Sequence, residues 1–166
     1  MGAFGVRAAK PPTRGHRAME FTQHPAFPTF AICAALLVLK MIGVGHFTGL
    51  LRIRREALLN PEDVDAFRSS KPQAAAEDPE VDRGLRAHRN DLESTLPFLA
   101  IGLPYLLTNP SSGLASGLFV AFTLFRYAFS IFYLKAIQPW RSLSFLLGEV
   151  CVLVMIVQML WWGFGQ

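Results

Sequence analysis

The chain of 166 residues contains little cysteine, little histidine and little charge. Its two cysteines, Cys33 and Cys151, both lie in apolar stretches, which excludes a disulfide framework and a cysteine-based metal cluster. His16, His24 and His46 have no companion at metal-ligand spacing, so we expect no metal site. Only 17% of the residues are charged and 52% are hydrophobic. This composition excludes a large soluble domain, and we expect no nucleic-acid partner.

The first 26 residues also lack the patterns of common targeting segments. Residues 1–18 contain no continuous apolar run of the kind that a secretory signal requires. Val6 occupies the position where N-myristoylation requires Ser or Thr. We therefore expect a disordered leader over residues 1–26 and a single membrane domain over residues 27–166.

Long apolar runs make up most of the remaining chain. Four of them approach the roughly 20 residues that cross about 30 Å of hydrocarbon. We expect transmembrane helices over about residues 27–51, 83–107, 114–136 and 141–164, with bends at Pro97 and Pro104 in the second. Short connections make consecutive helices antiparallel, which predicts an all-α, left-handed four-helix bundle in the endoplasmic reticulum or the bacterial inner membrane. Basic residues after the first and third spans place that side in the cytoplasm, although the basic leader opposes this orientation.

Charged residues crowd the start of the second predicted helix. At about 100° per residue, an arc of roughly 120° on one helical face carries Arg83, Arg86, Arg89, Asn90 and Glu93. His88 and Asp91 point away from this face. Guanidinium groups bind carboxylates in a bidentate manner, and a carboxylate offers a counter-charge to an ammonium group. The face therefore predicts a small zwitterionic ligand with several carboxylates. Anchoring at anionic lipid headgroups explains the first two arginines, but not the amide and the carboxylate deeper on the same face.

Three isolated charges share one depth in the predicted bundle. By the helical rise of about 1.5 Å per residue, Glu93, Arg126 and Glu149 all lie roughly 13–16 Å from the same side. Arg126 also shares a stripe of its helix with Ser130 and Tyr133. Two interpretations are open: Arg126 contributes to a ligand site, or it forms a structural ion pair with Glu93 or Glu149.

The fourth predicted helix opens with Arg141 and Ser142. A helix N-terminus favours negative charge, and a guanidinium group adds to this preference. This position is suited to hold an anion such as a thiolate. Tyr133 ends the preceding helix close by, where a tyrosine serves either as a site residue or as an anchor at the membrane interface.

Several segments together resemble the MAPEG family, the membrane-associated proteins in eicosanoid and glutathione metabolism. They are Asn60–Asp63, Arg86–Glu93 with Pro97–Phe98, Arg126–Tyr133, and Arg141–Ser142. The resemblance covers the chain from about residue 27 to its end. It implies a four-helix protomer, a homotrimer, and glutathione bound between neighbouring protomers.

The resemblance also implies roles for individual residues. The implied glutathione contacts, with Arg126 added, are Arg52, Arg86, His88, Arg89, Asn90, Glu93, Arg126 and Tyr133. Arg141 matches an arginine that stabilises the glutathione thiolate, and the resemblance gives Ser142 and Asp63 a part in proton or peroxide handling. A nearby guanidinium favours the thiolate, which is the competent nucleophile, so the residues and the resemblance agree.

Two branches of the family share features with this chain. The pair Arg141–Ser142 is similar to microsomal prostaglandin E synthase, whereas the loop around Pro61–Phe67 looks more like microsomal glutathione transferase. Phe129 and Phe145 replace a histidine and a tyrosine of the synthase pattern, and Val64 stands where the transferase has a reactive loop cysteine.

We therefore expect a membrane-bound glutathione transferase of detoxification or lipid metabolism, with glutathione-dependent peroxidase activity as a further expectation. Its substrates would be lipophilic electrophiles that enter from the bilayer. The alternatives are an isomerase of the prostaglandin E synthase type and a non-catalytic lipid-binding scaffold of the same family. A solute carrier would need a polar path across the membrane, for which the third and fourth spans offer little beyond Arg126 and Glu149.

Overall fold

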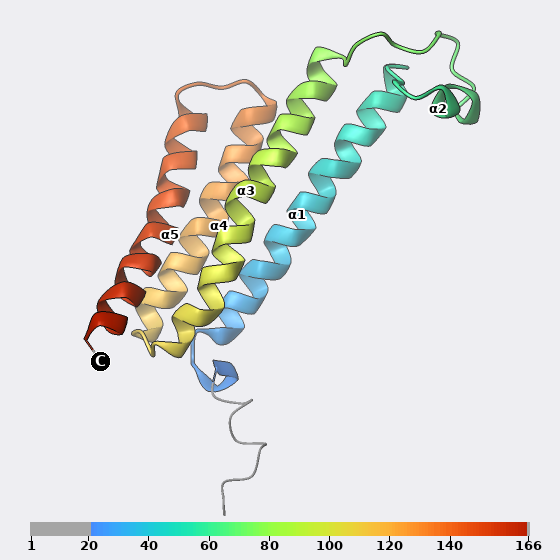
Figure 1. Ribbon diagram of the computed structural model, residues 1–166. Coiled ribbons are helices and arrows are strands. Elements are labelled where there is room, and N and C mark those ends of the chain that lie inside the picture. Colours follow the sequence, from blue (N-terminus) through green and yellow to red (C-terminus); the bar gives the residue numbers. More distant parts are fainter. Residues whose placement is uncertain (1–20, 166) are drawn as a thin grey trace, which may run out of the picture.

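The computed structural model describes residues 21–165, which are helical apart from their connections (Figure 1). The elements in chain order are η2 (Phe21–Gln23), α1 (Phe27–Arg54), α2 (Pro61–Ala66), α3 (Pro79–Leu107), α4 (Ser112–Leu134) and α5 (Trp140–Phe164). The long helices α1, α3, α4 and α5 lie side by side, each running opposite to the next along the chain (Figure 1). The predicted all-α class is confirmed, and the four long helices coincide with the four predicted spans apart from small differences at their ends.

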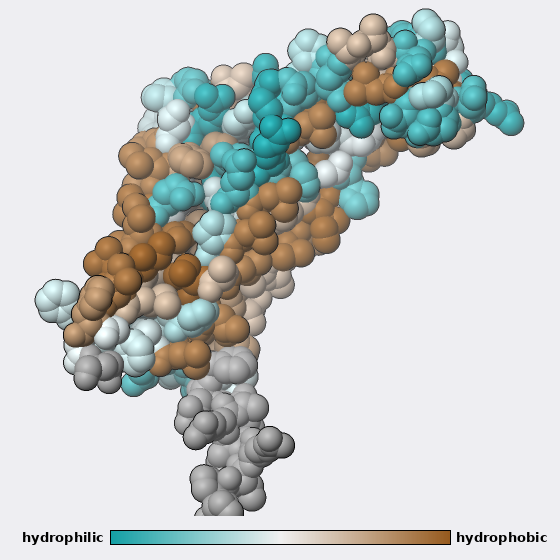
Figure 2. All heavy atoms as spheres, in the orientation of Figure 1, coloured by the Kyte–Doolittle hydropathy of each residue, from teal (hydrophilic) through white to brown (hydrophobic). Residues whose placement is uncertain are grey.

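Three of these helices, α1, α4 and α5, are long and apolar enough to cross a membrane. The helix α3 combines an apolar second half with a strongly charged first half. Figure 2 shows this division on the surface: hydrophilic residues cover the end of the molecule that carries α2 and continue over the upper half of α3, between apolar surfaces. The chain is therefore a membrane protein by these three helices, and the span predicted within α3 stays a prediction.

The order of the helices across the bundle decides which residues can meet. Both α3 and α4 pack against all the other long helices, whereas α1 and α5 make no contact with each other within residues 21–165. An aromatic core of Phe30, Phe98, Phe119 and Phe122 joins α1, α3 and α4, and the rings of Phe98 and Phe122 stack with centroids 4.3 Å apart. This core lies toward the end of the bundle opposite to α2. It fixes the mutual positions of the three helices.

Helix starts follow local sequence signals. Proline occupies one of the first two helical positions in α1, α2 and α3, where its missing N–H group costs no hydrogen bond. The side chain of Asp78 caps α3 by accepting hydrogen bonds from the backbone N–H groups of Glu80 and Val81, at 2.9 and 3.3 Å. The short helix α2 lies in the α1–α3 connection, beyond α1 in Figure 1. The segment Asn60–Asp63, which carries part of the family resemblance, includes the start of α2, but the sequence did not predict a helix there.

The predicted leader falls mostly outside the described part of the chain. Its residues 1–20 lie outside it, whereas η2 occupies part of the remainder. In this segment His24 is buried and connects two parts of the bundle: its Nδ1 accepts from the Ala26 N–H group at 3.1 Å, and its Nε2 lies 3.0 Å from the Pro110 carbonyl oxygen. The Ala26 donor makes Nδ1 the acceptor and leaves Nε2–H to donate to Pro110. The start of α1 is thus tied to the α3–α4 turn.

Candidate functional site

A pocket lies between α3, α4 and α5 near the ends that adjoin the α4–α5 turn. It has a volume of about 250 Å³ and is lined by Asn90, Phe129, Tyr133, Arg141, Ser142 and Phe145. One amide, one phenol, one guanidinium and one hydroxyl group therefore surround a space that also has two phenylalanine walls. The pocket can accept a ligand with a polar head and an apolar reacting partner.

Arg141 and Ser142 occupy the first turn of α5, which begins at Trp140. The guanidinium carbon of Arg141 lies 4.9 Å from the centre of the Tyr133 ring, so a cation–π contact holds the arginine at the pocket wall. The side-chain amide of Gln138 lies beside both residues: with its NH₂ group turned to Ser142 it donates to Ser142 Oγ at 3.1 Å, and its oxygen accepts from Arg141 Nε at 3.1 Å. The backbone N–H group of Arg141 donates to the Ile137 carbonyl oxygen at 3.2 Å, so it is not free to bind an anion. The positive end of the helix and the guanidinium group of Arg141 still favour negative charge at this position.

A cluster of buried charges lies directly behind the pocket, and it corrects the predicted ion pair. Arg126 binds neither Glu93 nor Glu149 by hydrogen bond: its Nη2 donates to Asp91 Oδ1 at 2.9 Å. Lys40 Nζ from α1 donates to the same oxygen at 2.7 Å. The sequence predicts correctly that Asp91 points away from the charged face of α3. It does not show that the side of α3 that carries Asp91 packs against the other helices. The predicted partner of Arg126 was therefore wrong.

Lys40 and Asp91 were missed as functional residues, although the sequence carries a signal for both. Lys40 belongs to the buried stripe of α1, Phe30, Cys33, Leu37, Lys40, Val44 and Thr48. Asp91 belongs to a stripe of small and polar buried residues on α3, which includes Gly84, Ala87, Ser94 and Thr95. Both stripes repeat at three- and four-residue spacing, the period of a helix face that packs in a bundle.

The structure brings only part of the predicted site together. Asn90, Tyr133, Arg141 and Ser142 line one pocket. Arg126 is fully buried behind it, and its guanidinium carbon lies 4.5 Å from the centre of the Phe129 ring. Arg126 therefore does not line the pocket.

The other predicted residues lie elsewhere in this chain. Arg52, at the end of α1, donates to Glu77 at 2.5 Å. Asp63, in α2, accepts from Asn60 at 2.9 Å. Arg86 pairs with Asp82 on its own helix. Arg52 is therefore not among the residues that line the pocket with Arg141.

His88, Arg89 and Glu93 occupy two further surfaces of α3. His88 lines an apolar groove of about 520 Å³ between α1 and α3, together with Gly45 and Gly49. Arg89 and Glu93 are exposed. Of the predicted charged face of α3, Asn90 lines the pocket, whereas Arg86, Arg89 and Glu93 do not.

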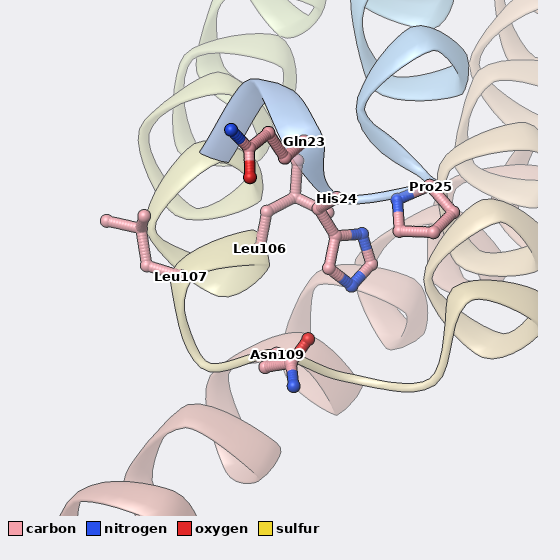
Figure 3. A pocket seen from close by; sticks show the side chains of 6 residues that line it. All are labelled: Gln23, His24, Pro25, Leu106, Leu107 and Asn109. Atoms are coloured by element: carbon pink, nitrogen blue, oxygen red, sulfur yellow. The ribbon is translucent and has the colours of Figure 1, made fainter. Parts of the chain in front are cut away.

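A second polar pocket lies at the opposite end of the bundle. Figure 3 shows Gln23, His24 and Pro25 facing Leu106, Leu107 and Asn109 across a space of about 290 Å³. Both nitrogens of His24 already have backbone partners. No charged residue lines this pocket, and within residues 21–165 no group of three His, Cys, Asp or Glu residues could hold a metal. The pocket beside Arg141 is the stronger candidate.

Comparison with known proteins identifies the family of this chain. Residues 30–161 match the family described as the MAPEG family. The chain belongs to the MAPEG family. Prostaglandin E synthase of Homo sapiens is 41% identical over 138 residues, which cover 82% of this chain and 90% of the relative. The same-named protein of Bos taurus is 39% identical over 144 residues, covering 86% and 93%.

A relative with a different name, a glutathione transferase, matches a similar length of this MAPEG chain. Microsomal glutathione S-transferase 1 of Sus scrofa is 35% identical over 144 residues, covering 85% of this chain and 93% of the relative. The membership expected from the resemblance is therefore confirmed. Relatives from both branches that the sequence resembled are found.

Proposed function

We propose that this chain is a membrane-bound glutathione-dependent enzyme that uses the pocket between α3, α4 and α5. The observation that carries the proposal is Arg141 in the first turn of α5, held over the Tyr133 ring at 4.9 Å beside Ser142. A guanidinium group and the positive end of a helix both stabilise an anion. The glutathione thiolate is the anion that the relative named as a glutathione transferase suggests.

The proposed reaction is nucleophilic attack by this thiolate on a lipophilic electrophile. The sulfur donates its electron pair to an electrophilic carbon, the carbon–sulfur bond forms, and the leaving group departs with the electron pair of its former bond. Arg141 holds the thiolate before attack. Phe129 and Phe145 give the electrophile an apolar surface on the far side of the pocket. Reduction of a hydroperoxide by glutathione is a further activity that the same thiolate would support.

An isomerase of the prostaglandin E synthase type is the second candidate. The observation that favours it is the 41% identity to prostaglandin E synthase of Homo sapiens over most of both chains. In that reaction the thiolate would attack one endoperoxide oxygen, so that a sulfur–oxygen bond forms, the oxygen–oxygen bond breaks, and the other oxygen leaves as an alkoxide that takes up a proton. Loss of a proton from the carbon that carries the sulfur-bound oxygen would then form the carbonyl group and break the sulfur–oxygen bond. The thiolate would be released, so glutathione would not be consumed. Ser142, beside Arg141 in the pocket, would be available to handle a proton or a peroxide oxygen. Both candidates use the same thiolate.

The proposal includes a homotrimer in which each site is shared. Arg52, Asp63 and His88 lie on the α1 and α2 side of the chain, away from the pocket that holds Arg141. A neighbouring protomer that presents this side to the pocket would supply them to the peptide part of glutathione. Arg86, Arg89 and Glu93 would lie at the edge of that interface, where guanidinium groups pair with the two carboxylates and Glu93 with the ammonium group.

Thiolate formation tests the proposal directly. The purified protein in detergent is titrated with glutathione while thiolate absorbance is followed at neutral pH. The parent should show a saturable thiolate signal, and Arg141→Ala should lose it. The matched control is Lys135→Ala, which removes an exposed positive charge at the same end of the bundle without touching the pocket. It should behave as the parent does. No thiolate signal in the parent would refute the proposal.

The two candidate reactions are separated by their products. An aromatic chloride electrophile should be conjugated with loss of one glutathione per product if the chain is a transferase. A prostaglandin endoperoxide should be converted without loss of glutathione if it is an isomerase. If the protein forms the thiolate but converts neither substrate, both proposed activities are refuted, whereas glutathione binding is still supported.

A further inference from the structure

Arg126 is too deeply buried to contact a ligand in the pocket. Its exposed fraction is 0%, and its guanidinium carbon lies 4.5 Å from the centre of the Phe129 ring and 5.9 Å from that of Phe145. These two rings line the pocket. Arg126 therefore stands behind the aromatic wall, and any part that it plays in binding passes through another residue.

Asn90 is the pocket residue that Arg126 holds. Arg126 Nη2 donates to Asn90 Oδ1 at 2.7 Å and to the Asn90 carbonyl oxygen at 3.2 Å. The first contact fixes which end of the planar amide points inward, because a guanidinium group can only donate. The Asn90 NH₂ group is on the other side of the amide, and no acceptor for it is found within residues 21–165. Asn90 thus offers two N–H donors to the pocket that it lines.

Arg126 is held through its side chain by α3 and through its backbone carbonyl oxygen by α1. Asp91 Oδ1 on α3 accepts a hydrogen bond from Arg126 at 2.9 Å, and the same oxygen accepts one from Lys40 on α1. Lys40 Nζ also donates to the Arg126 carbonyl oxygen at 3.1 Å and to Ser130 Oγ at 3.0 Å, so all three of its hydrogens have acceptors. On the side chain of Arg126, Nη2 makes the hydrogen bonds, whereas Nε and Nη1 have no partner within residues 21–165. Nη2 is therefore the group that ties the Asn90 amide to Asp91.

We propose that Arg126 is a positioning residue that acts through Asn90: it turns the Asn90 NH₂ group into the pocket, where this group donates to a carbonyl or carboxylate oxygen of the bound peptide thiol. The inference rests on the proposed function. It replaces the expectation that Arg126 binds glutathione directly. It also differs from a purely structural ion pair, because it makes glutathione affinity depend on Arg126 only while Asn90 is present.

A double-mutant cycle on glutathione affinity tests the inference. The variants are Arg126→Met, Asn90→Ala and the double variant, each compared with the parent by the thiolate titration. Arg126→Met leaves Lys40 and Asp91 as a balanced ion pair, so it does not strand a charge in the bundle. Each single variant should raise the Kd for glutathione about tenfold, the usual effect of one lost hydrogen bond.

The double variant should raise the Kd about tenfold as well, because Arg126 has nothing left to position. A roughly hundredfold rise in the double variant, or an unchanged Kd in Arg126→Met, would overturn the inference.

Two further variants separate positioning from general stability. Tyr105→Phe removes the 2.9 Å hydrogen bond between Tyr105 and Gln158 at the opposite end of α3, and should lower stability without changing the Kd. Asn90→Asp keeps an oxygen for Arg126 but loses the NH₂ group, so it should weaken glutathione binding at least tenfold. An unchanged Kd in Asn90→Asp overturns the inference even where Arg126→Met fails to fold. A parent that binds no glutathione refutes the proposed function itself, which is a different result.

Discussion

Replacing Asp91 by asparagine keeps the shape of the side chain but removes the charge between Lys40 and Arg126. In the parent, both cations donate to the same carboxylate oxygen, at 2.7 and 2.9 Å, and Asp91 is fully buried. Asp91→Asn therefore leaves two positive charges facing each other in the interior of the bundle. The variant is expected to be strongly destabilised.

The magnitude follows from this geometry. Because both nitrogens contact one oxygen, they lie no more than about 6 Å apart, and their repulsion at an effective dielectric constant of about 20 is roughly 3 kcal/mol. Removal of one partner of a buried ion pair generally costs about 3–5 kcal/mol. A loss of this size is a large part of the 5–15 kcal/mol that typically stabilises a protein.

The same reasoning predicts a rescue. Lys40→Met leaves Asp91 and Arg126 as a neutral pair, so it should cost less than Asp91→Asn. Adding Lys40→Met to Asp91→Asn removes the repulsion, and the double variant should be more stable than Asp91→Asn alone. Unfolding by sodium dodecyl sulfate in mixed micelles, followed by circular dichroism, measures all three. A double variant that is less stable than Asp91→Asn would show that repulsion between these cations is not what destabilises the single variant.

Three further predictions concern packing, pH and ligand binding. Gly84→Ala would place a Cβ 2.5 Å from Thr48 Oγ1 and 3.2 Å from Thr48 Cβ, so it should cost about 1–3 kcal/mol, whereas Gly43→Ala, with no atom within 4 Å, should lose nothing in the same unfolding assay. Desolvation raises the pKa of Asp78, but hydrogen bonds from the Glu80 and Val81 N–H groups and the charge of Arg55 outweigh it and hold that pKa below the ordinary aspartate value. The carboxylate therefore stabilises the fold fully above about pH 5 and less as the pH falls below about 3.9, so Asp78→Ala should lower the thermal midpoint at pH 7 and flatten its decline in acid; a decline as steep as that of the parent would contradict this. Glutathione at about one hundred times its Kd should stabilise the parent by about 2.7 kcal/mol and Arg141→Ala by much less, and equal shifts in a thermal melt would remove Arg141 from the binding site.

The sequence predicted the helices well because their signal is local. Apolar length, the prolines at helix starts and the polar turns fix where α1, α3, α4 and α5 begin and end, and all of these can be read from neighbouring residues. The short helix α2 was missed because three of its six residues are acidic and none of the six is buried. A helix of this kind has no amphipathic pattern to reveal it.

The candidate site was predicted in part, and the errors have one cause. The helical rise gives the distance of Arg126 along its helix, but the rotation of each helix about its axis depends on packing with the others. High charge on one face of α3 was taken as the mark of the site, although the inner face carried a single acid, Asp91, that binds two cations. The separation of Arg52 from Arg141 could not be predicted either, because it depends on which helices are neighbours.

The buried charge cluster also bears on how the chain enters the bilayer. A lysine or arginine near the centre of a lone membrane helix costs about 2.5–3.5 kcal/mol on insertion scales. The helix α1 carries Lys40 near its middle and is made first; α4 carries Arg126 and is made after α3. Lys40 and Arg126 each contact Asp91 only when α3 packs against α1 and α4. The same two ion pairs would stabilise α3, whose first half is polar, within the bundle. Insertion and tertiary packing are therefore coupled, and a fragment that ends before α3 leaves Lys40 in the bilayer without its carboxylate.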